Sequence, residues 1–118
     1  MYNTLKNPDL YLTSHEWDEY GNPLQDTNAA DEIRSYCPTT NVKAMDNCPR
    51  TLVIGTMDDE NVPFWNAVIF AKKLRDYVEG PENKDNVFLY IEEKGGHHFA
   101  SHRRLPIAAM SLTLILQN

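Results

Sequence analysis

Two short polar segments of this sequence carry the side chains whose types and order suit catalysis best. Asp58 and Asp59 follow one apolar run, and His97 and His98 follow a second apolar run and a pair of glycines. A carboxylate beside a histidine fixes the tautomer of the ring. It also stabilises the imidazolium that forms when the ring accepts a proton from a nucleophile. The pattern therefore favours an acid and a general base, one on each segment.

Taken one at a time, these residues have plainer interpretations. Asp59 by itself fits a turn or the cap of a helix that begins near Phe64 better than it fits catalysis, and His97 by itself fits an exposed loop. His98 and His102 lie four residues apart, the spacing at which two histidines share a helix face and can hold a metal ion. The sequence has no HExxH pattern and no third ligand at a defined spacing, so a metal-binding module is the lesser alternative. We expect neither a metal nor a cofactor.

The elements around the two polar segments predict a β-α-β unit. Residues 51–56 form a short apolar and β-branched run, typical of a strand buried on both faces. Residues 64–78 carry apolar side chains three or four apart, which predicts an amphipathic helix, and 87–91 is a second candidate strand. Two strands joined through a helix run parallel. The fold class is therefore α/β, and both polar segments leave the carboxyl edge of the sheet, where ligand crevices form.

The two ends of the sequence fit a domain of this size less well. Residues 1–28 show no useful periodicity and predict a long loop, after which Asn28 caps a short helix over 29–36 that Cys37-Pro38 ends. Residues 105–116 are apolar nearly all round, so a helix there needs cover on several sides, and 118 residues offer too little of it. We expect the sequence to be a piece of a larger domain.

Composition narrows the class of protein. With 42% hydrophobic and 24% charged residues the chain is globular, and its formal net charge of −6 at pH 7 argues against a nucleic-acid surface. No apolar run is long enough for a membrane span or a signal peptide. Cys37 and Cys48 are too far apart for a CxxC motif, and we interpret both as reduced. A cytoplasmic protein is the expectation.

From Leu10 to His97 the sequence resembles the C-terminal part of the catalytic domain of the prolyl oligopeptidase family of serine peptidases. Within that family it is most similar to the branch of oligopeptidase B and the prolyl endopeptidase-like proteins. Residues 16–23 are similar to that branch's EEWGNP signature and residues 33–42 to its SYSPYDNV segment. The segments that carry the resemblance are EWDEYGNP (16–23), IRSYCPTTNV (33–42), DENVP (59–63), FAKKLR (70–75) and GGH (95–97).

The resemblance implies the C-terminal portion of an α/β-hydrolase domain, with Asp59 as triad acid and His97 as triad base. Asp59 is preferred because Val62 then fits the family's D-x-R-V pattern without a gap, and Asp58 stays an alternative. At the arginine of that pattern this chain has Asn61, a neutral donor that binds a substrate carbonyl more weakly. Residues 1–118 would be a fragment that lacks the G-x-S-x-G nucleophile elbow and the β-propeller of the family.

The resemblance also implies a substrate. Glu16 and Asp18 stand where carboxylates of oligopeptidase B help to receive a basic side chain, although a merely hydrophilic loop fits them equally well. The predicted function is a serine-type endopeptidase that cleaves short peptides after basic residues. Its partners would be the peptide, the missing N-terminal part of its own catalytic domain and the propeller, without nucleic acid or membrane. This chain alone is expected to be inactive, and the alternative is a non-catalytic truncated paralogue or partner-binding fragment.

Overall fold

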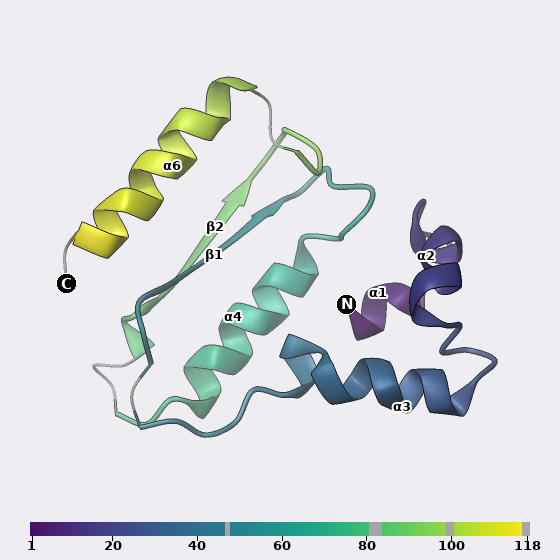
Figure 1. The fold of residues 1–118 in the computed structure, drawn as a ribbon. Coiled ribbons are helices and arrows are strands. Elements are labelled where there is room, and N and C mark those ends of the chain that lie inside the picture. Colours follow the sequence, from purple (N-terminus) through teal and green to yellow (C-terminus); the bar gives the residue numbers. More distant parts are fainter. Residues whose placement is uncertain (47, 81–83, 99–100, 117–118) are drawn as a thin grey trace.

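The computed structural model describes residues 1–46, 48–80, 84–98 and 101–116, and it has an α/β architecture (Figure 1). A group of helices formed by the N-terminal third lies beside a β-α-β unit, and a last helix lies on the opposite side of that unit. In chain order the elements are α1 (Tyr2–Leu5), α2 (Thr13–Tyr20), α3 (Thr27–Tyr36), the 3-10 turn η1 (Pro38–Thr40), β1 (Thr51–Thr56), α4 (Trp65–Tyr77), β2 (Val87–Glu92) and α6 (Ser101–Leu116).

The two strands pair in parallel, as the sequence predicts. Their register runs from Thr51 opposite Val87 to Thr56 opposite Glu92, and α4 connects them. Parallel pairing needs a crossover of this kind because the chain must return to the starting edge of the sheet. As a result, β1 and β2 end side by side, and the loops that follow them leave from the same edge.

Helix α4 packs against the sheet through its apolar face. The buried cluster contains Cys48, Ala71, Leu74, Val78 and Val87, which join the helix to the start of β2. At the other end of the helix, close packing depends on Gly55 of β1. A Cβ added at Gly55 would lie 3.2 Å from Ala67 Cβ of α4 and 3.2 Å from Ile91 Cδ1 of β2. The helix therefore lies tight against the strands at the end that carries the polar loops.

The prediction of a long loop over residues 1–28 is wrong, because α1 and α2 form there. Tertiary hydrogen bonds hold these short helices: Trp17 Nε1 donates to the carbonyl of Leu5 at 2.9 Å, and Thr13 Oγ1 donates to the carbonyl of Thr4 at 3.0 Å. Isolated helices this short are unstable in water, so periodicity does not reveal them. They exist through their contacts with each other.

Helix α3 begins two residues before the predicted start. Its N-cap is Asp26, whose carboxylate accepts a hydrogen bond from the backbone N–H of Asn28 at 2.8 Å. Asp and Asn are both good N-caps, so residue type alone does not choose between them. The helix ends at Tyr36, before Cys37-Pro38, as predicted.

Side-chain hydrogen bonds fasten the N-terminal helices to the β-α-β unit. Asn66 Nδ2, in the first turn of α4, donates to Thr4 Oγ1 at 3.1 Å. Lys73 Nζ, two turns further along, donates to the carbonyl of Thr39 at 2.8 Å. Two anchors along one helix fix α1 and η1 relative to α4, and so place the N-terminal helices near the loop that precedes α4.

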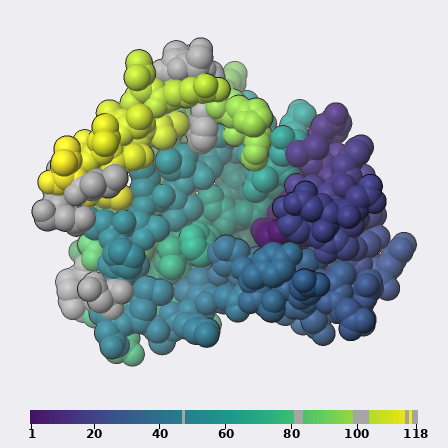
Figure 2. Space-filling view, in the orientation of Figure 1, coloured from purple at the N-terminus to yellow at the C-terminus, as the bar shows by residue number. Residues whose placement is uncertain are grey.

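Helix α6 lies along the other side of the sheet and leaves much of its apolar surface exposed. Leu105, Leu112 and Leu116 are 80%, 58% and 79% exposed. A groove of about 460 Å³ separates the helix from the strands; its walls are Leu52, Phe88, Leu89, Tyr90, Ala109, Met110, Thr113 and Leu114. Figure 2 shows α6 and the N-terminal helices at opposite sides of the molecule. None of the helices in the described ranges is both long and apolar enough to cross a membrane.

Candidate active site

The predicted acid and base lie in the two loops that leave the carboxyl edge of the sheet. The backbone N–H of Met57, just beyond β1, donates to the carbonyl of Glu92, the last residue of β2, at 2.8 Å. This bond extends the parallel pairing by one residue. Asp59 and His97 therefore start from adjacent points, although 38 residues separate them in the sequence.

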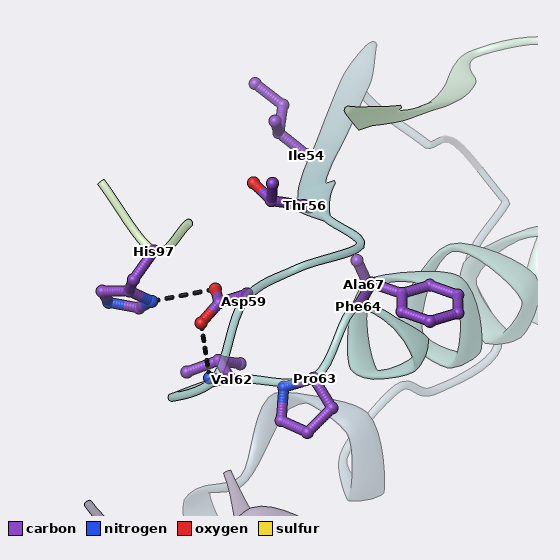
Figure 3. A pocket seen from close by; sticks show the side chains of 9 residues that line it. Ile54, Thr56, Asp59, Val62, Pro63, Phe64, Ala67 and His97 are labelled. Atoms are coloured by element: carbon purple, nitrogen blue, oxygen red, sulfur yellow. Dashed lines mark hydrogen bonds and ion pairs between the residues drawn. The ribbon is translucent and has the colours of Figure 1, made fainter. Parts of the chain in front are cut away.

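Asp59 and His97 form a direct hydrogen bond. His97 Nδ1 lies 2.9 Å from Asp59 Oδ2 (Figure 3). An ionised carboxylate only accepts hydrogen bonds, so Nδ1 carries a proton, and in the neutral ring Nε2 is then the acceptor nitrogen. The His97 side chain is 39% exposed and that of Asp59 only 10%. The pair thus presents an oriented imidazole with its acceptor nitrogen available to a substrate or a nucleophile.

The second oxygen of Asp59 is held by the backbone of its own loop. The N–H groups of Asn61 and Val62 both donate to Oδ1 at 2.9 Å. These two bonds make Asp59 the centre of a tight turn, which is the plainer role that its residue type also predicts. The turn and the bond to His97 use different oxygens, so both roles are filled at once and the turn fixes the carboxylate that faces the ring.

The structure separates Asp58 from Asp59. The Asp58 carboxylate accepts hydrogen bonds from the backbone N–H of Gly95, at 3.0 and 3.2 Å, and of Gly96, at 2.9 Å. Because these two N–H groups favour the charged form, with Gly96 first and Gly95 second, the pKa of the Asp58 carboxyl lies below its ordinary value. Sequence reasoning missed this link. The signal for it was a second carboxylate opposite two adjacent glycine N–H groups.

A small pocket opens beside the pair. It has a volume of about 180 Å³ and is lined by Ile54, Gly55, Thr56, Asp59, Val62, Pro63, Phe64, Ala67 and His97. Most of this lining is apolar, and Figure 3 shows the polar atoms of the acid and base on one side of it. An apolar wall with a few convergent polar groups is typical of a site for small molecules or for a side chain of a peptide.

The predicted substrate carboxylates lie on α2, and the structure does not bring them together as a pair. Glu16 is half-buried, whereas Asp18 is exposed, and residues two apart on a helix do not face each other. Glu16 lines a pocket of about 210 Å³ with Met1, Thr4, Leu5, Tyr20 and Val62. Val62 also lines the pocket beside His97, so the two pockets adjoin. Asn61 is half-buried in the turn that holds Asp59.

Of the histidine pair considered as an alternative metal site, the structure describes the side chain of His98 and not that of its partner. His98 is exposed, and its ring lies 5.0 Å from the ring of His97, edge to face. The side chain of His102 lies outside the described residues. Among those that are described, no three histidine, cysteine, aspartate or glutamate side chains come together as metal ligands.

Comparisons with known proteins agree on one family. The sequence profile of the prolyl oligopeptidase family matches residues 1–113. The prolyl endopeptidase-like protein of Pongo abelii is 30% identical over 114 residues, which cover 89% of this chain and 15% of that protein. Dipeptidyl aminopeptidase BI of Pseudoxanthomonas mexicana is 31% identical over 101 residues, covering 85% and 13%.

A solved structure gives the same answer for the fold. Oligopeptidase B from Leishmania major superimposes with a TM-score of 0.70 and 31% sequence identity, over 81% of this chain and 13% of that one. This agreement confirms the α/β-hydrolase fold class that the sequence predicts. The chain spans about 15% of the length of the first of these relatives.

Proposed function

Because the chain belongs to the prolyl oligopeptidase family of serine peptidases, we propose that Asp59 and His97 are the acid and base of its catalytic triad. The observation that carries this proposal is the 2.9 Å hydrogen bond between His97 Nδ1 and Asp59 Oδ2. In a serine hydrolase this bond selects the tautomer whose Nε2 can take the proton of the nucleophile. The apolar pocket beside the pair supports a substrate at that position.

The reaction is acyl transfer in two steps. His97 Nε2 accepts the serine proton while the serine oxygen forms a bond to the carbonyl carbon of the substrate. His97 Nε2 then gives that proton to the leaving amine as the C–N bond of the substrate breaks. Water repeats the sequence on the acyl-enzyme and releases the acid. Asp59 stabilises the imidazolium formed in each step. No G-x-S-x-G motif occurs in residues 1–118, so the serine of this proposal belongs to another part of the protein.

We accordingly assign residues 1–118 to the C-terminal part of a larger catalytic domain, with a β-propeller elsewhere in the same protein. The 15% coverage of the first relative supports this assignment, as does the exposed apolar surface of α6. The cytoplasm is the proposed compartment. Cys37 and Cys48 are both buried free thiols, which fits a reducing environment.

The proposed substrates are short peptides cut after a basic residue. Glu16 is the best placed acceptor for the basic side chain, because its pocket shares Val62 with the pocket beside His97. A half-buried carboxylate forms stronger charge-assisted hydrogen bonds to a guanidinium than an exposed one does. Asp18 and Asn61 are assigned to the same substrate from the resemblance to the family, and neither lines either pocket.

A fluorophosphonate probe tests the triad proposal. The protein is the longest product of the gene that contains residues 1–118, and the readout is the rate at which the probe labels the serine. We expect His97→Ala to slow labelling by about 10³-fold or more. His98→Ala is the matched control, because His98 is exposed next to His97 and is expected to leave the rate unchanged. Equal labelling of wild type and His97→Ala would exclude His97 as the base.

A non-catalytic binding role is the second candidate. The exposed leucines of α6 favour it, because a large unpaired apolar surface marks a contact with another chain or domain. The same probe separates the two candidates. A binding protein is not labelled at all, whereas a peptidase is labelled in a way that depends on His97.

A further inference from the structure

The loops that carry the candidate acid and base are linked at three successive positions. The backbone N–H of Met57 donates to the carbonyl of Glu92. Asp58 then accepts from the N–H groups before His97, and Asp59 bonds to the His97 ring. The pairing of the two strands is thus continued by side chains beyond the point where backbone pairing stops.

We propose that Asp58 is a positioning residue, whose carboxylate holds the Gly95-Gly96 backbone so that His97 stays within reach of Asp59. This rests on the proposed function of Asp59 and His97 and adds a residue to it. Asp58 touches neither substrate nor the reacting atoms in this account. It acts on catalysis only through the place of the histidine.

The histidine loop needs such a hold because of its glycines. Gly96 has φ +61°, a left-handed conformation that other residues rarely adopt, and glycine loses more conformational freedom on ordering than any other residue. Two glycines directly before the base make the loop both sharply turned and easily displaced. The bond to Asp59 alone ends on a side chain that is 39% exposed.

The contact of Asp58 is well suited to fixing a backbone. One oxygen, Oδ1, accepts from both Gly95 at 3.0 Å and Gly96 at 2.9 Å. Successive N–H groups that point to one spot form a concave site for an anion, and a charged acceptor makes each bond stronger than a neutral one. These hydrogen bonds restrain the two residues directly before His97, and so they fix the position of the His97 backbone.

The expected signature is a loss of rate without a loss of binding. A displacement of about 1 Å in a catalytic group costs up to about 10²-fold in rate, while the pocket walls stay where they are. In the longest gene product we expect Asp58→Ala to lower kcat by about 10- to 100-fold on a short peptide with an internal arginine, cut at the bond that follows it. KM should stay within about twofold of wild type, the operational limit for unchanged binding.

Two variants keep the experiment decisive. Asp58→Asn retains an oxygen that can accept both glycine N–H groups, so it is expected to restore most of the rate, and it serves if the alanine variant folds poorly. Glu60→Ala removes an exposed carboxylate from the same loop and is expected to behave like wild type. The proposal is overturned if Asp58→Ala matches Glu60→Ala, if Asp58→Asn falls as far as Asp58→Ala, or if KM rises as much as kcat falls.

Hydrogen exchange separates this proposal from the triad itself. Mass spectrometry of the segment 93–98 in the full protein reads the Asp58 contact whether or not the protein is a peptidase. We expect faster exchange there in Asp58→Ala and unchanged exchange in Glu60→Ala. If His97→Ala keeps full activity but the exchange difference is present, the triad fails and the contact stands. If exchange is unchanged, the contact fails whatever the activity.

Discussion

At the residue scale, two adjacent aspartates have different partners. Asp59 bonds to the ring of His97, and Asp58 bonds to the backbone that precedes it. The two aspartates lie at a turn directly after β1, where the backbone N–H of Asp59 donates to the carbonyl of Thr56 at 3.3 Å, and this one short loop supplies both contacts. The sequence left the choice of acid open, and of the two aspartates, both within the described residues, it is Asp59 that forms a hydrogen bond to the His97 ring.

The Asp59 carboxylate should be needed for its charge and for the tautomer that it selects. In Asp59→Asn, an amide NH2 can face Nδ1 and leave the proton on Nε2, where it blocks general-base action. We expect kcat to fall by about 10³- to 10⁴-fold in the longest gene product with the fold intact, measured by peptide hydrolysis and circular dichroism. Glu60→Gln, a neighbouring charge removal, should leave kcat unchanged. Activity of Asp59→Asn within tenfold of wild type would contradict the assignment.

The depressed pKa of Asp58 predicts an acid-sensitive contribution to stability. Its pKa is lowered on folding, so the contribution is fully present above the unfolded value of about 3.9 and is lost as the pH falls through the folded pKa. Lys94 adds to the lowering, after the two glycine N–H groups. Between pH 6 and pH 3 wild type should therefore lose more free energy of unfolding than Asp58→Asn. Equal losses in urea titrations at the two pH values would contradict this.

At the element scale, the β-α-β unit was predictable and the N-terminal helices were not. The two strands were predictable because residues 51–56 and 87–91 are short apolar runs. Helix α4 was predictable because its apolar residues recur every three or four positions. Helices α1 and α2 depend instead on single tertiary bonds such as Trp17 Nε1 to Leu5. A contact across 12 residues leaves no local pattern. The same reason hid the contact of Asp58 with the glycines, which spans 37 and 38 residues.

Packing of α4 on the sheet predicts a cost for any side chain at Gly55. An added Cβ would lie 3.2 Å from both Ala67 Cβ and Ile91 Cδ1, closer than ordinary van der Waals contact. Gly55→Ala should lower the free energy of unfolding by about 1 to 3 kcal/mol, measured by chemical denaturation. Gly96→Ala is the comparison: no atom of the described residues lies within 4 Å of its added Cβ, so its expected cost comes from φ, about 1 to 2 kcal/mol. An unchanged stability of Gly55→Ala would show that α4 sits further from β1.

At the scale of the whole molecule, the candidate catalytic pair lies at one edge of the sheet and an exposed apolar surface lies on another side. The candidate acid and base lie at the carboxyl edge of the sheet, whereas the groove beside α6 and the exposed Leu105 and Leu116 lie on its other side. The expected shortage of protein around residues 105–116 agrees with this exposure. The surface that covers helix α6 was not predictable. The hydrophobicity of a segment indicates that it is buried, but it does not identify the surface that buries it.

Residues 1–118 expressed alone should therefore self-associate. We expect oligomers at micromolar concentration by size-exclusion chromatography with light scattering, because apolar surface of this kind drives association. Leu112→Glu places a charge on a leucine that is 58% exposed and should shift the chain toward monomer. Asn28→Glu adds the same charge at an exposed position of α3 and should not. A monomeric, cooperatively folded wild-type chain would contradict the expectation that another surface must cover the apolar side of α6.

The measurement that tests the central claim most directly is a double-mutant cycle on Asp59 and His97. It compares kcat/KM of the longest gene product for wild type, Asp59→Ala, His97→Ala and the double variant. Residues that act as one catalytic unit are strongly non-additive, so the double variant should be about as slow as His97→Ala alone. Independent losses that multiply in the double variant, or single variants as active as wild type, would contradict the claim that the two residues work as acid and base together.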